Sequence, residues 1–317
     1  MAWLSDYSYR KEINITGETG ASTDYQVKLL IGESSGATGE DFDVAEHSED
    51  FPAAKDDGGD LRFTDNDGST ELDFWVESVS GTTPNQLAIV WVEVADDLGS
   101  NQSIYCYYGN SGATNGSSGD DTFTLFDDFG SVDTVKWTVT GSPTVSSSII
   151  TCLTDNRIAS KSTFGNTIAL RARVTDQGAA SFDSGMIGFS TSSTGAAGYS
   201  YDLYGNYPTS SVINGLGGGS PGFTMGNDGT TPHIYDALRS GSQCEMLSDG
   251  VSKGTLTSGS TASLYLRISG DGKPGLGNTL VDWLFIRKYQ ATEPAFSTAE
   301  SEEDIPATAT GNFFIMF

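Results

Sequence analysis

The stretch from Asp60 to Glu77 constrains the fold of this chain more than any other part of the sequence. Apolar residues occupy every second position on both sides of an Asn-Asp-Gly tripeptide, and they are Leu61, Phe63, Leu72, Phe74 and Val76. A repeat of two residues is that of a β-strand, whose successive side chains point to opposite faces. Asn66 and Gly68 tolerate the positive φ angles of tight turns. The stretch therefore predicts a β-hairpin.

Short alternating segments of the same kind recur along the chain, separated by turns rich in glycine. The sequence has 39 glycines and only 18% charged residues, and no part of it shows the pattern of a long amphipathic helix. Strands at this spacing are typical of β-sandwiches and jelly rolls. We expect an all-β protein of two β-sandwich domains, with less than about 10% helix against the usual third.

The segment from Ser111 to Asp121 consists mainly of Gly, Ser, Asn and Asp, which is typical of a flexible linker. A chain of 317 residues is long enough for two domains that each bury a core. We therefore predict a first domain at residues 1–120, a second at residues 121–296, and an acidic tail with an apolar end at residues 297–317.

Acidic residues outnumber basic residues by 42 to 16, which gives a formal net charge of -26. Such a charge repels nucleic acid and anionic lipid, so we exclude both as partners. It suits a protein that stays soluble in a saline setting, and it leaves open divalent cations bound at acidic turns. No run of about 18 apolar residues predicts a membrane span, and the N-terminus lacks the pattern of a signal peptide.

The three cysteines lie far apart in the sequence, with only two histidines to accompany them. A zinc site needs clustered thiolates and imidazoles, so we expect none. Cys106 lies in an apolar alternating run and is expected in the core. The sequence leaves open whether Cys152 and Cys244 form a disulfide.

Several motifs occur in the order found in a β-sandwich family called DUF2341. They are Trp3, Tyr9–Ile13, Asp24–Val27, Gly59–Asp65, Trp75–Glu77, Ile89–Val92 and Ile104–Asn110. The first 120 or so residues resemble that family, whose biochemical role is unassigned, so the resemblance implies architecture alone.

The second half resembles a concanavalin A-like (laminin G-like) jelly roll over residues 121–290. The segments that carry this resemblance are Leu125–Phe129, Trp137–Val139, Ile158–Lys161, Ala169–Val174 and Val281–Lys288. The resemblance implies binding of glycans or proteins and, in some members, hydrolysis of glycans. The pair of domains implies an extracellular or virion surface protein of archaea, bacteria or their viruses.

Hydrolases of this fold usually carry Glu-x-Asp-x-Glu on one strand, and residues 121–290 contain no such triplet. His47 and His233 do not lie beside a nucleophile in the sequence. We therefore expect that the protein is not an enzyme.

Three aspartates suggest a Ca²⁺ site, because hard cations prefer oxygen ligands. Asp127 and Asp128 open the jelly roll and Asp282 lies on its last strand, and the first and last strands of this fold commonly pair. The alternative is that these carboxylates accept hydrogen bonds from neighbouring backbone amides. The Asp65–Gly68 turn also offers oxygens, with hairpin geometry as the alternative explanation.

A cluster of tyrosines beside polar residues suggests a glycan site, because sugars bind flat apolar rings flanked by directed polar groups. The candidate residues are Tyr199, Tyr201, Asp202, Tyr204, Asn206 and Tyr207. The alternative is that the tyrosines are part of the sheet or its core.

The tail ends in an apolar run, and a free solvated tail gains nothing from such residues. We expect Phe313, Phe314, Ile315 and Phe317 to insert into a neighbouring subunit or partner protein, which favours a homo-oligomer or a larger assembly. The alternative is that the tail returns to the first domain as an added strand. The function we expect is a surface glycan-binding virion component or cell-surface adhesin; a structural decoration or tail protein and a degenerate glycoside hydrolase are the alternatives.

Overall fold

The computed structural model describes residues 3–305 except 154, 178–185, 194–198, 205–211, 215–222, 225–230, 258 and 271–277. Within strands, the backbone alone is described for residues 176–177, 186, 199–204, 212–214, 223–224 and 278. The described chain is almost entirely β, with one four-residue helix, α1 (Gly119–Thr122). This confirms the expected all-β fold. No helix among the described residues is long and apolar enough to cross a membrane.

The chain divides into two compact units, each described here by itself. Unit 1 comprises residues 1–122 together with 294–317, and unit 2 comprises residues 123–293. The two units meet between Thr122 and Phe123, and the described C-terminal residues 294–305 are grouped with unit 1.

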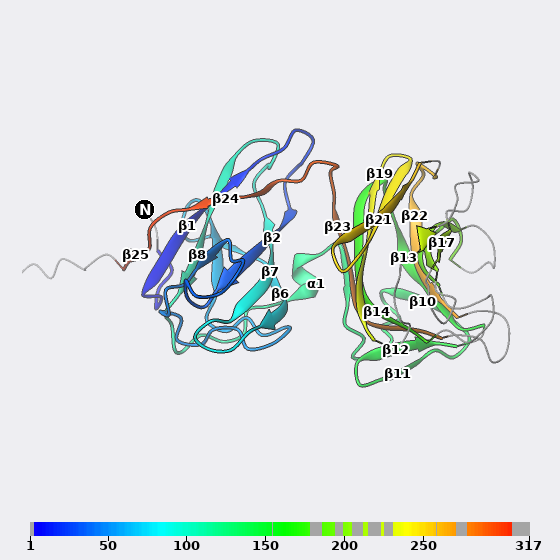
Figure 1. Cartoon of the computed structure of the whole chain (residues 1–317), viewed down its shortest axis with the longest axis horizontal. Coiled ribbons are helices and arrows are strands. Elements are labelled where there is room, and N and C mark those ends of the chain that lie inside the picture. The colour runs from blue at the N-terminus through cyan, green and yellow to red at the C-terminus, as the bar shows by residue number, and fades with distance from the viewer. Residues whose placement is uncertain are drawn as a thin grey trace, which may run out of the picture. The chain divides into compact units, whose positions relative to one another are not determined.

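Unit 1 is a sandwich of two sheets (Figure 1). Sheet I has the order β24-β1-β8-β4-β5, with β25 also paired to β1, and sheet II has the order β3-β2-β7-β6. The strands are β1 (Tyr9–Thr16), β2 (Tyr25–Gly32), β3 (Phe42–Asp43), β4 (Arg62–Asp65), β5 (Glu71–Leu72), β6 (Phe74–Ser80), β7 (Leu87–Val94), β8 (Gln102–Tyr108), β24 (Ala295–Ala299) and β25 (Glu303–Asp304).

The core of unit 1 forms where the alternate apolar residues of the two sheets meet. Ile13 and Ile15 of β1 and Val27 and Leu29 of β2 are fully or almost fully buried in it. The strand β7 lies between β2 and β6 and is apolar on both faces, as expected for a central strand.

The hairpin predicted at residues 60–77 is shorter than expected. Only β4 and β5 pair as a hairpin, through Phe63 with Leu72 and Thr64 with Glu71. The chain then leaves sheet I, and β6 pairs with β7 in sheet II. Phe74 and Trp75 are both buried, so β6 is covered on both faces although it is the edge strand of sheet II, and it does not continue the hairpin as a half-exposed strand.

The segment expected to be a flexible linker is hydrogen-bonded to unit 1. The backbone N–H of Ser118 donates to the carbonyl oxygen of Phe74 over 2.8 Å, and the amide of Val76 donates to Ser117 Oγ over 3.0 Å. Asn115 Oδ1 accepts from the amide of Gly58 over 2.9 Å. The polar side chains of this segment satisfy backbone groups of unit 1, which explains their abundance without flexibility.

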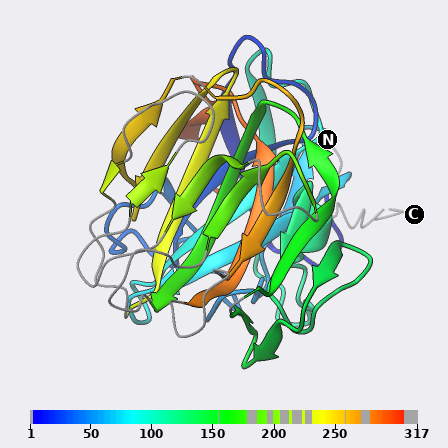
Figure 2. The same cartoon turned by 90° about the vertical axis from the view of Figure 1, so that its right-hand side faces the viewer.

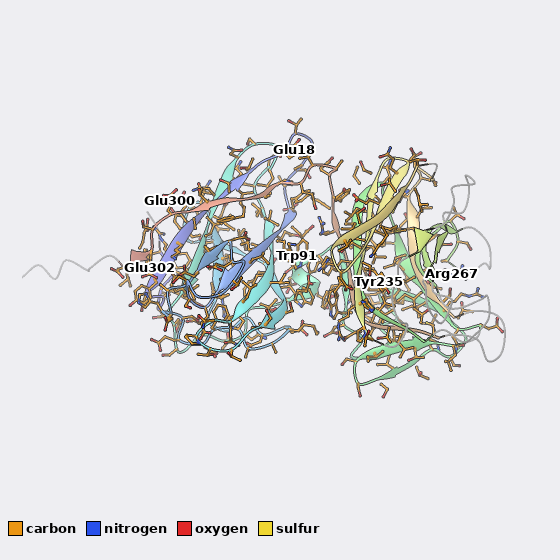
Figure 3. The ribbon with its side chains drawn as sticks, viewed as in Figure 1. Glu18, Trp91, Tyr235, Arg267, Glu300 and Glu302 are labelled. Carbon is orange, nitrogen blue, oxygen red and sulfur yellow. The ribbon has the colours of Figure 1, made fainter. Side chains whose placement is uncertain are left out.

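Residues 295–305 complete unit 1 by pairing with β1 (Figure 1). The segment holds Arg10 through Glu303, with the guanidinium Nε 2.7 Å from the carboxylate. Glu302 (labelled in Figure 3) lies 2.8 Å from His47 Nδ1 and accepts from the Tyr108 hydroxyl over 2.7 Å. Phe313, Phe314, Ile315 and Phe317 lie outside the described residues, so insertion into a partner and return to the first domain both stay predictions for the apolar end.

Unit 2 is a larger sandwich of two sheets, seen face-on in Figure 2. Sheet III has the order β11-β12-β23-β14-β19-β20-β21, with β9 paired to β23, and sheet IV has the order β10-β13-β22-β15-β16-β17-β18. The strands are β9 (Leu125–Asp127), β10 (Trp137–Thr140), β11 (Thr144–Ser146), β12 (Ile149–Cys152), β13 (Arg157–Phe164), β14 (Thr167–Gln177), β15 (Met186–Ser190), β16 (Tyr199–Tyr204), β17 (Val212–Asn214), β18 (Phe223–Thr224), β19 (His233–Ser240), β20 (Gln243–Ser248), β21 (Val251–Leu256), β22 (Leu264–Ser269) and β23 (Asn278–Lys288).

A buried arginine joins two connecting segments at the edge of this core. Arg239 of β19 has 0% of its surface exposed. Its guanidinium donates to the carbonyl oxygens of Phe164 (3.3 Å), Gly165 (2.7 Å), Ser260 (2.7 Å) and Ala262 (2.5 Å). These oxygens belong to the β13–β14 turn and to the segment before β22, so one side chain fixes both.

Candidate functional site

One face of sheet IV points away from the hydrophobic core and carries polar groups. On β22, Leu264, Leu266 and Ile268 belong to the core, so the residues between and after them lie on the opposite face. The register brings Arg157 of β13 opposite Ser269, and Ser190 of β15 opposite Tyr265. We call this surface the sheet IV face, and its residues are Arg157, Ser190, Tyr265, Arg267 and Ser269.

Much of the sheet IV face is shielded from solvent although it lies opposite the core. Arg267 (labelled in Figure 3) is 3% exposed, Ser269 is 2% exposed and Ser190 is 0% exposed. Arg157 and Tyr265 are half-buried. The Ser190 hydroxyl donates to the carbonyl oxygen of Ser192 over 3.0 Å. Buried polar groups need partners, so this face is a polar environment and not a second hydrophobic core.

The register of sheet IV places Asp202 in line with Arg267. Arg267 pairs with Gly188 of β15, Gly188 pairs with Asp202 of β16, and Asp202 pairs with Asn214 of β17. Three strands spaced ~4.8 Å apart thus carry a basic residue, a glycine and an acidic residue in one row.

The remaining residues predicted for a glycan site divide into two groups. Tyr204 lies opposite Met186, in the row next to Asp202, whereas Tyr201 lies opposite Phe189, which belongs to the core. Tyr199 lies opposite Ser190 beyond an irregularity in the register. Asn206 and Tyr207 lie outside the described residues. The site expected around these tyrosines stays a prediction, with Asp202 and Tyr204 on the strand that borders the sheet IV face.

The three aspartates predicted to hold Ca²⁺ do not come together. The strands β9 and β23 pair as expected, with Asp127 opposite Leu284. Asp127 accepts hydrogen bonds from the Trp137 indole and the Phe129 amide on the core side of sheet III. Burial raises the pKa of Asp127 above its ordinary value, although these two hydrogen bonds oppose the shift.

Asp282 forms an ion pair with Arg173. Arg173 lies between the core residues Ala172 and Val174, so this pair occupies the opposite side of sheet III from Asp127. Asp128 follows β9 directly. Within the parts of the chain that the structure describes, no group of three or more His, Cys, Asp or Glu side chains could hold a metal ion. The calcium site therefore stays a prediction that the placement of these residues does not support.

The Asp65–Gly68 turn uses its oxygens for its own backbone. Asp67 accepts hydrogen bonds from the amides of Ser69 and Thr70, over 2.7 and 2.8 Å, and from the Thr70 hydroxyl over 2.7 Å. The hydrogen bonds from Thr70 and Ser69 lower the pKa of Asp67 to about 2. Gly68 has a φ of 76°, which its missing side chain permits. This arrangement fits the hairpin explanation of the turn.

The two ring nitrogens of His233 lie near a hydroxyl group and a carboxylate. Thr231 Oγ1 is 3.3 Å from His233 Nε2, and Asp249 Oδ2 is 2.6 Å from His233 Nδ1. Asp249 also accepts from the Ile234 amide over 3.0 Å. Burial would raise the pKa of Asp249, but the hydrogen bonds from Ile234 and His233 outweigh it and leave the pKa below its usual value. Because Asp249 is bound to residues of β19 in this way, we interpret these hydrogen bonds as holding the β20–β21 turn against β19.

All three cysteines are free and buried. Cys152 and Cys244 therefore form no disulfide with each other. Burial raises the pKa of the Cys152 thiol to about 12, and it also raises the pKa values of Cys106 and Cys244. A thiolate is the reactive form of cysteine, so none of the three has the character of a nucleophile or metal ligand.

No curated protein matches the chain in sequence. Residues 57–140 match DUF2341, a domain of unknown function. The match begins before β4 and ends at β10, so it covers the later part of unit 1 and the start of unit 2, whereas we expected the resemblance over residues 1–120. It confirms the expected resemblance to DUF2341 over these residues.

Several solved structures are similar to about half of the chain. A β-glucanase of Bacillus licheniformis is 13% identical, with a TM-score of 0.41, over 52% of this chain and 97% of that protein. A Crh5 transglycosylase is 17% identical, with a TM-score of 0.41, over 54% of this chain and 86% of that protein. A κ-carrageenase from Pseudoalteromonas carrageenovora, solved with an oligotetrasaccharide of κ-carrageenan, is 15% identical, with a TM-score of 0.35, over 51% and 92%. The two-sheet sandwich of unit 2 agrees with the jelly roll expected for the second domain.

These similar structures correct the expectation that the protein is not an enzyme. They include glucanases and transglycosylases, so the absence of an enzymatic role is no longer expected. Our expectation depended on the missing Glu-x-Asp-x-Glu triplet. The chemistry needs two carboxyl groups at the right separation, roughly 5–9.5 Å, and it does not require that both belong to one strand. A missing linear motif therefore does not exclude the activity.

Proposed function

We propose that unit 2 is a carbohydrate-active jelly roll that binds a polysaccharide on the sheet IV face. The observation that carries this proposal is the set of groups on that face. Tyr265 offers an aromatic ring, and Arg157 and Arg267 offer fixed donors on neighbouring strands. Asp202 and Tyr204 continue the set on β16. Sugar sites combine a flat apolar ring with directed polar groups in this way.

The test is binding of the full chain to a panel of polysaccharides, measured by affinity electrophoresis and titration calorimetry. Tyr265→Ala removes the ring and is expected to weaken binding about tenfold, with an unchanged melting temperature. Val251→Ala is the matched control, because Val251 is 58% exposed on β21 of sheet III. Binding that Tyr265→Ala leaves intact would move the site away from the sheet IV face, and a panel without any binding would overturn the proposal.

Glycoside hydrolysis on the same face is the second candidate. Among the strands of sheet IV that the structure describes, Asp202 is the one carboxylic residue. It lies two strands from Arg267, in the same row of the sheet. Hydrolysis requires a pair of carboxyl groups. Asp202 would supply one, and another segment of the chain would supply the second. We expect release of reducing ends from a bound polysaccharide, and loss of that release in Asp202→Asn with binding retained. Equal release by parent and variant would exclude Asp202 from the reaction.

We further propose that the protein acts at a virion or cell surface, as part of a larger assembly. The support is the surface context implied by the two-domain resemblance, together with the apolar residues near position 317. The segment 294–305 is bound in unit 1, so only residues 306–317 remain to reach a partner, a span of about 40 Å when fully extended. Deleting residues 311–317 should leave both units folded and abolish assembly. A deletion variant with the parental oligomeric state in light scattering would refute this role.

A further inference from the structure

Three side chains near the start of β19 form an array of a hydroxyl group, an imidazole and a carboxylate. Thr231 Oγ1 lies 3.3 Å from His233 Nε2, and Asp249 Oδ2 lies 2.6 Å from His233 Nδ1. The imidazole therefore contacts the hydroxyl group through one ring nitrogen and the carboxylate through the other. Hydrolases with a hydroxyl nucleophile use the same order of groups, and the arrangement is recognised by its geometry and not by sequence position.

The local sequence allows the hydroxyl group and the imidazole to meet. Thr231 and His233 are separated by Pro232 alone. In an extended segment, residues two positions apart point to the same face. Proline disfavours the helical conformation of the residue before it, so Pro232 favours an extended backbone at Thr231.

The carboxylate of the array is fixed by two bonds to Ile234 of β19. Asp249 lies in the β20–β21 turn, where its amide donates to the Ile234 carbonyl oxygen over 2.7 Å. Its Oδ1 accepts from the Ile234 amide over 3.0 Å, which leaves Oδ2 to face His233. The two bonds to Ile234 are sufficient to hold the turn against β19, so the contact with His233 is open to a further role.

An ionised Asp249 sets the tautomer of His233. Burial would raise the pKa of Asp249, but the hydrogen bonds from Ile234 and His233 hold that pKa below its usual value, so the carboxylate is charged at neutral pH. It accepts the proton on Nδ1 of His233, and Nε2 keeps a lone pair that faces the Thr231 hydroxyl. Nε2 can then take the proton of that hydroxyl and make Thr231 a nucleophile.

The two outer groups of the array are accessible, while the imidazole between them is mostly covered. Thr231 is exposed, and 52% of the Asp249 side chain is exposed against 23% of the His233 side chain. The ring centroid of His233 lies 6.2 Å from that of Tyr235 (labelled in Figure 3), which belongs to the core of unit 2. A substrate can therefore reach Thr231 Oγ1 from solvent while the imidazole keeps its position beside the core.

The other histidine of the chain has a carboxylate partner without the hydroxyl group. His47 Nδ1 lies 2.8 Å from a Glu302 oxygen, and its ring is stacked on Tyr9 with centroids 4.4 Å apart. Among the described residues, no hydroxyl group forms a hydrogen bond with His47 Nε2. His47 is therefore a matched control for an imidazole that lacks a nucleophile.

We propose that Thr231, His233 and Asp249 form an esterase site that hydrolyses carboxylic esters. In the first step, Thr231 Oγ1 bonds to the acyl carbon and the bond from that carbon to the alcohol oxygen breaks. His233 Nε2 takes the hydroxyl proton and gives it to the departing alcohol. Thr231 and His233 are the catalytic residues, and Asp249 is a positioning residue that acts through His233.

The second step releases the acyl group from Thr231. The oxygen of a water molecule bonds to the acyl carbon, and the bond from that carbon to Thr231 Oγ1 breaks. His233 Nε2 takes a proton from the water and returns it to Oγ1, so a carboxylic acid leaves and the site is restored. The site does not depend on polysaccharide binding at the sheet IV face.

The test uses p-nitrophenyl acetate and the full chain, with two readouts. Release of p-nitrophenol gives kcat and KM, and mass spectrometry after an acid quench locates the acetyl group. We expect acetylation of Thr231 in the parent. Thr231→Val and His233→Ala should each lower kcat/KM about a hundredfold and abolish that acetylation, because a positioned base contributes roughly 10²–10⁴ in rate. Thr231→Ser should be acetylated at the same position, because serine supplies the same hydroxyl group.

Two further variants separate this site from background chemistry and from a purely structural role. His47→Ala should keep the parental kcat/KM, which excludes reaction with any accessible imidazole. Asp249→Asn should lower kcat about a hundredfold with KM and the melting temperature unchanged. Thr231→Val leaves the contact between His233 and Asp249 in place, so it stays informative if His233→Ala folds poorly. Parental kcat/KM in a folded Thr231→Val, a parent no faster than buffer, or acetyl groups on lysines alone overturns the proposal.

Discussion

Replacing Arg239 by Met is expected to destabilise unit 2 strongly. The guanidinium is fully buried and donates to four carbonyl oxygens in two connecting segments. A hydrogen bond to a charged group contributes roughly 1.5–3 kcal/mol, and a buried acceptor left without a donor costs roughly 1–3 kcal/mol. Methionine keeps much of the apolar packing, and carbonyl oxygens near the surface can bind water instead. We therefore expect a loss of about 3–5 kcal/mol, less than the sum of four separate bonds.

The assay is differential scanning calorimetry of the full chain. For a unit of this size, 1 kcal/mol shifts the melting temperature by roughly 2–4 °C, so the transition of unit 2 should fall by about 10 °C. Arg173→Met is the matched control. The Arg173 side chain is 38% exposed and pairs with Asp282 on the outside of sheet III, and exposed ion pairs contribute about 0–1 kcal/mol. Melting temperatures of the two variants that agree within about 2 °C would refute the role given to Arg239.

Three further predictions follow from the structure. Removing residues 294–317 takes β24 and β25 from β1, so the calorimetric transition of unit 1 should fall by several degrees while that of unit 2 stays; an unchanged unit 1 would contradict the pairing. Asp67→Asn should lower the urea midpoint at pH 6 and not at pH 2, because the depressed pKa of about 2 stabilises the fold above the unfolded value of about 3.9, and this stabilisation is lost as the pH falls through 2; equal effects at both pH values would count against it. Ellman's reagent should label no cysteine in the folded protein and all three in urea, because burial raises their pKa values; rapid labelling of the folded chain would show that a thiol is accessible.

The sequence was sufficient to predict strands and insufficient to predict which strands pair. Alternation identified an all-β chain of short strands, because one buried face enforces a period of two. It failed at Trp75, which it grouped with polar positions. That side chain is fully buried in the structure and donates to Asp56 Oδ1 over 2.5 Å. Trp75 interrupts the alternation because β6 is covered on both faces, so an apolar residue also lies between the core positions Phe74 and Val76.

The candidate site was harder to predict than the fold, because its residues meet only through cross-strand register. Arg157 and Arg267 are more than a hundred positions apart in the sequence and lie on paired strands. Nothing local in the sequence indicates that they share a sheet. The aspartates show the converse case. Asp127 and Asp282 lie on paired strands as expected, yet they occupy opposite sides of sheet III.

The pairing of β1 with the C-terminal strands decides how the molecule responds to a pulling force. Tyr9 pairs with Asp304, and the ladder continues to Thr16 and Ala295. The strands are antiparallel, so tension that enters through the chain before Tyr9 and after Asp304 acts on the same end of the ladder. The pairs then separate one after another, as in unzipping, instead of sharing the load in shear. Unit 2 bears no tension until that ladder has opened. When the chain is pulled at both ends of unit 1, the strands of unit 1 separate first and the jelly roll stays folded.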